Sequence, residues 1–180
     1  MRRLELALEA VRRDDGAFEF VSSDHPDYGS IDQVACEVNP HNFEDVAIAV
    51  PNYLAIALQV VPREPTQLKH VFYHRKDLYY EVARATVARD GEALRFVDGS
   101  LKGRHTYTQP GWESQIEPIG AEEPPLPPRL LTPAAYAEIA KVAVEQNPDA
   151  LRWVPPRRPE YEAIATHARR ARNVQQRLGA

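Results

Sequence analysis

Two histidines four residues apart are the clearest candidate for chemistry in this 180-residue chain. His70 and His74 lie in Leu68–His74, and a helix there would place both imidazoles on one face, a spacing that can hold a zinc ion. No glutamate follows His70 as in the zinc-protease motif, so a third ligand such as Asp77 or Glu81 has to be assumed. The alternative is a solvated or hydrogen-bonded pair. These histidines therefore support, as an alternative hypothesis, a small metal-binding protein or enzyme.

Other patterns that carry chemistry are missing from the sequence. It has no glycine-rich phosphate loop, no nucleophile elbow and no paired-cysteine metal motif, and no spacing selects a serine–histidine–aspartate triad. The single Cys36 cannot form an internal disulfide, which agrees with a reducing compartment, and we expect it to be a small buried residue. The sequence thus favours a non-catalytic, cytoplasmic protein without a cofactor, although a secreted effector is not excluded.

Three segments of twelve residues resemble one another, and this repetition indicates the architecture. They are 10–21, 86–97 and 143–154, and each has an apolar stripe, a polar turn and a second apolar stripe that closes on a valine. A looser copy runs from Ala49 to Val61. Self-similarity at a spacing of tens of residues is typical of stacked repeats. We therefore predict an all-α fold of stacked helix–turn–short-helix units.

The third copy shows the expected unit most clearly. Its apolar residues follow the 3.6-residue period of one helical face, at Tyr136, Ile139, Ala140, Ala143 and Val144. Thr132 is expected to cap this helix, Pro133 to occupy its first position, and Asn147 to end it. At the corresponding turn of the second segment, Gly91 is expected to adopt a left-handed conformation, so that a β-branched residue there would destabilise the fold.

The remaining segments are predicted from their composition. The apolar stretch Val46–Val61 contains a proline and two polar residues, and we expect buried core rather than a membrane span. Ile31–Val38 fits one helix, ended by Asn39 and Pro40. Another helix is expected to open at Tyr161, whereas the basic segment 169–180 is expected to fray or to cap the stack.

These units resemble a bacterial helical-repeat family known as domain of unknown function 4116. The best match is Ala143–Val154, followed by the next helix start at Pro159 and Glu160; 86–97 and 10–21 match less fully. The resemblance covers about half of the chain and implies an all-helical fold. The family has no known catalytic residues, so the resemblance implies no site.

The domain prediction has three parts. A helical region of about three units occupies 1–117, a proline-rich linker occupies 118–132, and the final repeat with a basic C-terminal helix occupies 133–180. The linker follows from residues 118–128, where five of eleven residues are proline and extended polyproline II is favoured. Within it, the Pro124–Arg129 sequence matches the pattern of an SH3 ligand, which matters only where SH3 domains are present, and a plain linker is the favoured interpretation.

Charge is distributed unevenly along the chain. Residues 1–50 carry four basic and eleven acidic side chains, whereas residues 151–180 carry seven basic and two acidic ones. Opposite charge at the two ends can steer a polar partner or favour head-to-tail self-association. The basic C-terminal segment can also contact phosphates, but the chain as a whole has a net charge of -4 and nucleic-acid binding is not favoured.

The leading hypothesis is a protein–protein interaction module, such as an adaptor or an immunity-type or effector-type accessory protein. Helical repeats present long surfaces, and such surfaces usually serve protein partners. The candidate partner-binding residues are the acidic turns at Asp14, Asp15 and Asp90. Alternatives are the histidine-centred metal protein and a structural subunit that polymerises through its oppositely charged ends.

Overall fold

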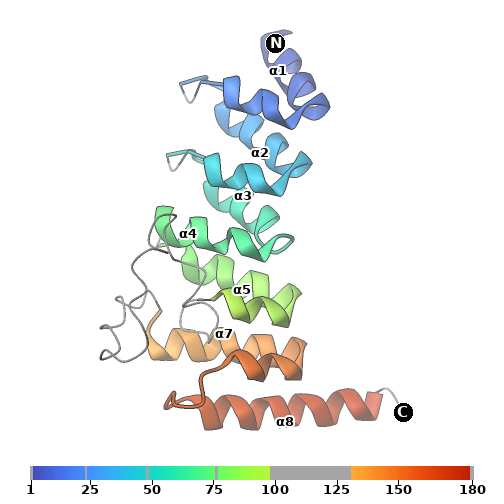
Figure 1. Ribbon diagram of the computed structural model, residues 1–180, viewed down its shortest axis with the longest axis vertical. Helices are drawn as coiled ribbons and strands as arrows, with labels where there is room; N and C mark the ends of the chain where they lie inside the picture. The colour runs from blue at the N-terminus through green and yellow to red at the C-terminus, as the bar shows by residue number, and fades with distance from the viewer. Residues whose placement is uncertain (1, 23, 48, 76, 98–130, 179–180) are drawn as a thin grey trace, which may run out of the picture. The chain divides into compact units, whose positions relative to one another are not determined.

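The computed structural model describes residues 2–22, 24–47, 49–75, 77–97 and 131–178, and within these ranges the chain is helical with no β-strand (Figure 1). The chain divides into two compact units, Met1–Thr86 and Val87–Ala180. Most of the predicted linker 118–132 lies outside the described residues, as does the SH3-like segment. The all-α fold class is confirmed, whereas the stacking of whole repeats stays a prediction.

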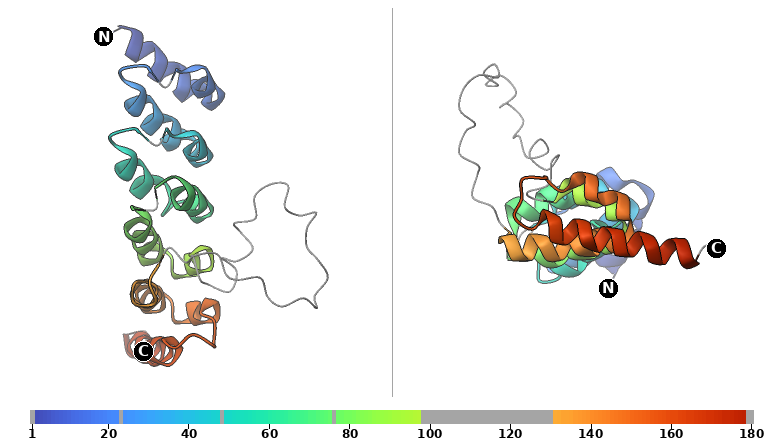
Figure 2. Two further views of the ribbon diagram at one scale, coloured as in Figure 1. Left: turned by 90° about the vertical axis from the view of Figure 1, so that its left-hand side faces the viewer. Right: turned by 90° about the horizontal axis from the view of Figure 1, so that it is seen from below.

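The first unit alternates α-helices with shorter 3₁₀-helices. Its elements are α1 (Arg2–Arg13), η1 (Asp15–Phe20), α2 (Tyr28–Val38), η2 (Pro40–Asp45), α3 (Tyr53–Val60), η3 (Pro65–Gln67), α4 (Leu68–His74) and most of α5 (Tyr79–Arg89). Within this unit the helices α1, α2 and α3 lie in one layer, and η1 and η2 lie beside them in another (Figure 2, left). The predicted helix that Asn39 ends is α2, which begins three residues earlier than expected.

The second unit has four elements after the end of α5. They are η4 (Gly91–Phe96), α7 (Pro133–Gln146), η6 (Pro148–Trp153) and α8 (Tyr161–Leu178). The predicted boundaries of α7 are confirmed: Thr132 Oγ1 accepts a hydrogen bond from the Ala135 N–H at 3.2 Å, Pro133 is the first residue, and Asn147 follows the last turn. Five predicted stripe residues of α7 are buried, namely Tyr136, Ile139, Ala140, Ala143 and Val144.

Among the described residues, one local structure occurs four times, twice in each unit. An α-helix ends at an aspartate or asparagine with φ between -145° and -134° and ψ between 106° and 109°, and a six-residue 3₁₀-helix and a valine follow. The capping residues are Asp14, Asn39, Asp90 and Asn147. In each case the side-chain oxygen accepts the N–H two residues further on, at 2.9–3.0 Å. Short oxygen-bearing side chains suit this position because they satisfy an N–H that the new helix leaves free.

Two expectations about these turns are wrong. The second closing valine is Val46, which follows η2, whereas Val61 continues the α3 pattern by donating its N–H to Ala57 O at 2.9 Å. Gly91 does not have a left-handed backbone, because the extended Asp90 makes the turn. Glycine is required there for another reason: a Cβ would lie 2.5 Å from Ala143 O.

Apolar burial follows the predicted periodicity within each unit. In the first unit, Val11, Phe18, Ile31 and Ala35 form a cluster where α1, η1 and α2 meet. The stretch Val46–Val61 is core as predicted, with buried side chains at Val46, Val50, Tyr53, Ile56, Ala57, Val60 and Val61. Cys36 is also buried, as expected.

The basic C-terminal segment is helical as far as it is described, to Leu178, rather than frayed. Helix α8 continues to Leu178, and side chains from its second half contact the elements before it. Arg172 Nη2 donates to Asp149 Oδ1 at 2.7 Å, and Gln175 Nε2 donates to the carbonyl of Glu145 at 3.4 Å. The acceptors of these bonds are the Asp149 carboxylate and a backbone carbonyl near the end of α7, so the polar side chains of α8 stabilise this helix.

Candidate functional site

The acidic turns predicted to bind a partner have a structural role of their own. Asp14 accepts the Gly16 N–H at 3.0 Å, and Asp90 accepts the Glu92 N–H at 2.9 Å. These side chains therefore cap η1 and η4, which accounts for their identity without a partner. The side chain of Asp15 lies outside the described part of the chain. Partner binding by the three aspartates stays a prediction.

The predicted histidine pair lies on one helix, α4, four residues apart. His70 Nε2 lies 3.7 Å from Glu44 Oε2, whereas the imidazole of His74 is not among the described side chains. Asp77 forms an ion pair with Arg75 at 2.7 Å, and this hydrogen-bonded guanidinium lowers the pKa of Asp77. No group of three metal-ligating side chains occurs within the described ranges. Metal binding at His70 and His74 thus stays a prediction.

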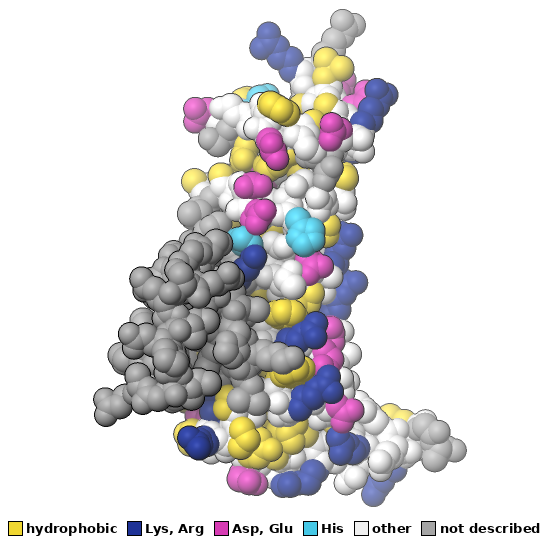
Figure 3. Space-filling view, viewed as in Figure 1, with side chains coloured by type: hydrophobic (Ala, Val, Ile, Leu, Met, Phe, Trp, Pro, Cys, Tyr) yellow, Lys and Arg dark blue, Asp and Glu magenta, His cyan; other side chains and the backbone are white. Residues whose placement is uncertain are grey.

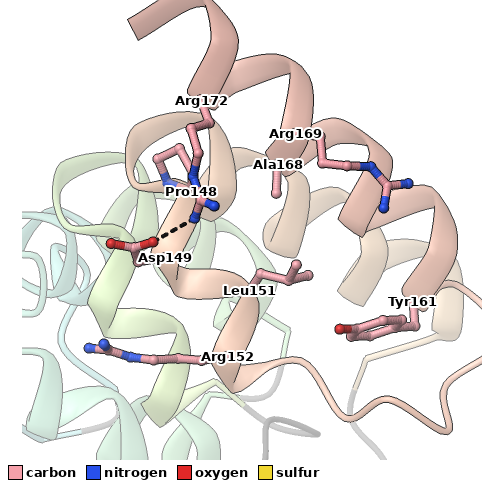
Figure 4. A pocket seen from close by; sticks show the side chains of 8 residues that line it. All are labelled: Pro148, Asp149, Leu151, Arg152, Tyr161, Ala168, Arg169 and Arg172. Atoms are coloured by element: carbon pink, nitrogen blue, oxygen red, sulfur yellow. Dashed lines mark hydrogen bonds and ion pairs between the residues drawn. The ribbon is translucent and has the colours of Figure 1, made fainter. Parts of the chain in front are cut away.

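An open groove of about 350 Å³ lies in the second unit, between η6 and α8 (Figure 4). Its apolar lining comes from Pro148 and Leu151 on η6 and from Tyr161 and Ala168 on α8. The short η6 holds Leu151 at the groove because Asn147 and Val154 fix its two ends. Tyr161 is the first residue of α8, so its ring stands at the other end of the groove from Arg172 (Figure 4).

Three arginines border this groove: Arg152, Arg169 and Arg172. Arg172 pairs with Asp149, and Arg152 pairs with Glu92. Arg169 differs, because its Nη2 donates to the Thr166 hydroxyl at 2.9 Å and no described carboxylate lies within ion-pair distance. Figure 3 shows one face of the second unit, where hydrophobic side chains lie beside Lys and Arg side chains. The groove is thus apolar at its base, with a net positive border.

Glu92 fixes the position of η6 against η4. Its Oε1 accepts Asn147 Nδ2 at 3.1 Å, and its Oε2 accepts Trp153 Nε1 at 3.0 Å together with the guanidinium of Arg152. Gln146 Oε1 adds a bond from the Gly91 N–H at 2.8 Å. One partly buried carboxylate therefore contacts three side chains at the two ends of η6 and orients the η6 side of the groove.

A second pocket, of about 270 Å³, occupies the first unit between η1 and α2. Phe18, Val21 and Tyr28 line it together with the carboxylates of Glu19 and Asp45. The rings of Phe18 and Tyr28 lie 5.8 Å apart and are tilted by 37°. Like the larger groove, this pocket lies between a six-residue 3₁₀-helix and the start of the next α-helix. Its charged lining residues are acidic, whereas those of the larger groove are mainly basic.

Sequence reasoning did not predict either pocket. From the sequence, Arg169 and Arg172 are candidates only for phosphate contacts, although their three-residue spacing places them on one side of a helix. The η6 side chains carry no comparable signal, because Leu151 fits a core position equally well. The groove is a consequence of how α8 packs on η6, which periodicity within each element does not specify.

Comparisons with known proteins yield no match to a family model, a curated protein or a solved structure. The resemblance to domain of unknown function 4116 therefore stays an expectation. In the described ranges, no helix has the length and apolar character needed to cross a membrane.

Proposed function

We propose that the chain is a non-catalytic interaction module that binds a protein partner in the groove between η6 and α8. The observation that carries the proposal is the groove itself: an apolar base next to Arg169, a cation with no carboxylate within ion-pair distance in the described chain. Protein interfaces combine a buried apolar centre with a polar border, and arginine is enriched in them. The groove supplies both parts within one small region.

The charge of the groove selects the partner. Three guanidinium groups and one carboxylate border it, so a neutral or acidic segment is favoured over a basic one. An acidic side chain facing Arg169 and an apolar side chain against Leu151 would satisfy the site. As part of the same proposal, the buried, unpaired Cys36 suits a reducing cytoplasm, where the chain would act as an adaptor or accessory protein.

Charge reversal at neighbouring residues tests this proposal. Arg169 and Arg170 are both exposed on α8, but only Arg169 lines the groove. The tagged wild-type chain, Arg169→Glu and Arg170→Glu are each used to capture proteins from lysate of the native host. We expect a stoichiometric partner that wild type and Arg170→Glu recover in equal amounts and that Arg169→Glu recovers in a clearly smaller amount. Equal capture by all three proteins would contradict the proposal.

A further inference from the structure

We infer that the partner in this groove is a second copy of the chain, which inserts the Phe20 ring and places Glu19 against Arg169. The inference rests on the proposed function, because it names the occupant of the same groove. It takes two observations together: an aromatic side chain that the first unit leaves uncovered, and a groove in the second unit with the chemistry to cover it.

Phe20 is unusual for its position in the local structure. It is the last residue of η1 and is 89% exposed, whereas Phe96 and Trp153, the last residues of η4 and η6, are only partly exposed. In those two helices the preceding arginine covers the ring, with Arg95 4.6 Å from the centre of the Phe96 ring and Arg152 5.1 Å from that of Trp153. A guanidinium over an aromatic face is a favourable cation–π contact.

In η1 the preceding residue is Glu19, which cannot cover a ring in this way. One guanidinium can form an ion pair with the Glu19 carboxylate and a cation–π contact with the Phe20 ring. No described cation lies within ion-pair distance of Glu19, and a large exposed aromatic next to such a carboxylate is a candidate contact surface. The pair Glu19 and Phe20 thus lacks the arginine that the corresponding pairs have.

The groove between η6 and α8 supplies that arginine. Arg169 can pair with Glu19 of another molecule, while Leu151 and Tyr161 offer an apolar surface for the Phe20 ring. A buried phenylalanine removes on the order of 150–250 Å² of surface from water, so the contact is small and its affinity is modest. The negative charge of residues 1–50 and the positive charge of residues 151–180 favour the encounter at low salt.

The two sides of this contact come from different units of the chain, Phe20 from the first and the groove from the second. A contact of that kind is heterologous, because each copy offers its groove to one neighbour and its Phe20 to another. Such contacts give open chains or closed rings rather than a symmetric pair. The inference therefore predicts association that grows with concentration. It also predicts that a variant without Phe20 and a variant with an altered groove bind each other.

Sedimentation velocity of the full chain over about a hundredfold concentration range tests the inference. We expect the mean sedimentation coefficient of wild type to rise with concentration at low salt and to fall when salt is added. Phe20→Ser should weaken the association by about tenfold or more. The matched control is Leu6→Ser, which removes another exposed apolar side chain, 65% exposed on α1, and should associate like wild type.

A mixing experiment makes the test specific to this pair of surfaces. Phe20→Ser keeps the groove and Arg169→Glu keeps Phe20, so each should stay monomeric alone and the mixture should form a finite one-to-one complex. Monomeric wild type at every concentration would overturn the inference, as would unchanged association of Phe20→Ser. If wild type is monomeric but still captures a different protein through Arg169, the inference fails and the proposed function stands. If neither self-association nor Arg169-dependent capture is seen, both fail.

Discussion

Replacement of Asp32 by alanine should stabilise the chain at neutral pH, which is the opposite of the usual effect of a substitution in a buried position. Asp32 lies four residues after Tyr28 in α2 and is 0% exposed. The residue four positions after the tyrosine in α3, α5, α7 and α8 is a buried alanine in every case: Ala57, Ala83, Ala140 and Ala165. Asp32 thus places a carboxyl group where the comparable helices have a methyl group.

The surroundings of this carboxyl disfavour its ionised form. Neither of its oxygens has a partner with hydrogen-bond geometry. Burial raises the pKa of Asp32 from 3.8 to about 7, and interaction with the Tyr28 hydroxyl offsets only part of this rise. The titratable groups that interact with Asp32 are Tyr28 and Cys36 of α2, and Asp45 of η2 acts in turn on those two; none of the three is a cation. The structure therefore keeps Asp32 protonated up to neutral pH.

The magnitude follows from the two pKa values. Below pH 4 the folded and unfolded chains both hold the proton, so Asp32 has no effect on the pH dependence. Between pH 4 and 7 only the folded chain holds it, and the free energy of unfolding falls by about 1.4 kcal/mol per pH unit. Over three units the loss reaches about 4 kcal/mol as an upper bound, and above pH 7 it levels off. Asp32→Ala removes this loss, so its advantage over wild type should be larger at pH 7.5 than at pH 5.

Urea unfolding at the two pH values measures the effect. Far-UV circular dichroism follows the helices of the whole chain, those of the first unit included. Both tryptophans lie outside residues 1–86, so tryptophan fluorescence serves as an internal control from the rest of the chain. Asp24→Ala is the matched control, because Asp24 is exposed. The reasoning is refuted if Asp32→Ala is less stable than wild type at pH 7.5, or if its difference from wild type is the same at both pH values.

Three further predictions concern the second unit. Gly91→Ala should lower the free energy of unfolding by about 2 kcal/mol or more, because a Cβ there would lie 2.5 Å from Ala143 O. Gly16→Ala should cost much less, because its Cβ would meet only Asp14 Oδ1 at 3.2 Å. Thermal unfolding compares the two variants, and equal losses would contradict the steric argument. Asn147→Ala should cost about 1 kcal/mol in urea unfolding through loss of the cap on η6, and an unchanged midpoint would show that the cap is dispensable. Glu92→Leu should cost about 1–3 kcal/mol and increase amide exchange in η6, since the Trp153 and Asn147 donors lose their acceptor; unaltered exchange would refute this role.

The sequence predicts those parts of the fold that depend on short-range order. The cap at Thr132, the start at Pro133 and the end at Asn147 all follow from the residues themselves, and the structure confirms each. Helical periodicity is local in the same way, which is why the buried stripe of α7 is predicted residue by residue.

Features that depend on packing between elements are not predicted. Gly91 is necessary because of the close approach of Ala143 in α7, 52 positions away in sequence, and not because of its own backbone conformation. The true second closing valine, Val46, follows a short helix that has Asn42 and Asp45 where the other copies have an alanine and an aromatic residue, so the apolar pattern of those copies misses it. Asp32 is unexpected in the core for a related reason: only its alignment with the buried alanines of other helices shows that its position is an interior one.

A photo-crosslinking amino acid placed at Tyr161, inside the groove between η6 and α8, tests the central claim most directly. The control carries the same group at Gln176, which is exposed on α8 but does not line the groove. Both proteins are irradiated in native lysate, and the adducts are identified by mass spectrometry. The account predicts a discrete protein adduct at Tyr161 that excess unlabelled wild type displaces and an excess of the double variant Phe20→Ser, Arg169→Glu does not. No adduct at Tyr161, or equal adducts at both positions, would contradict it.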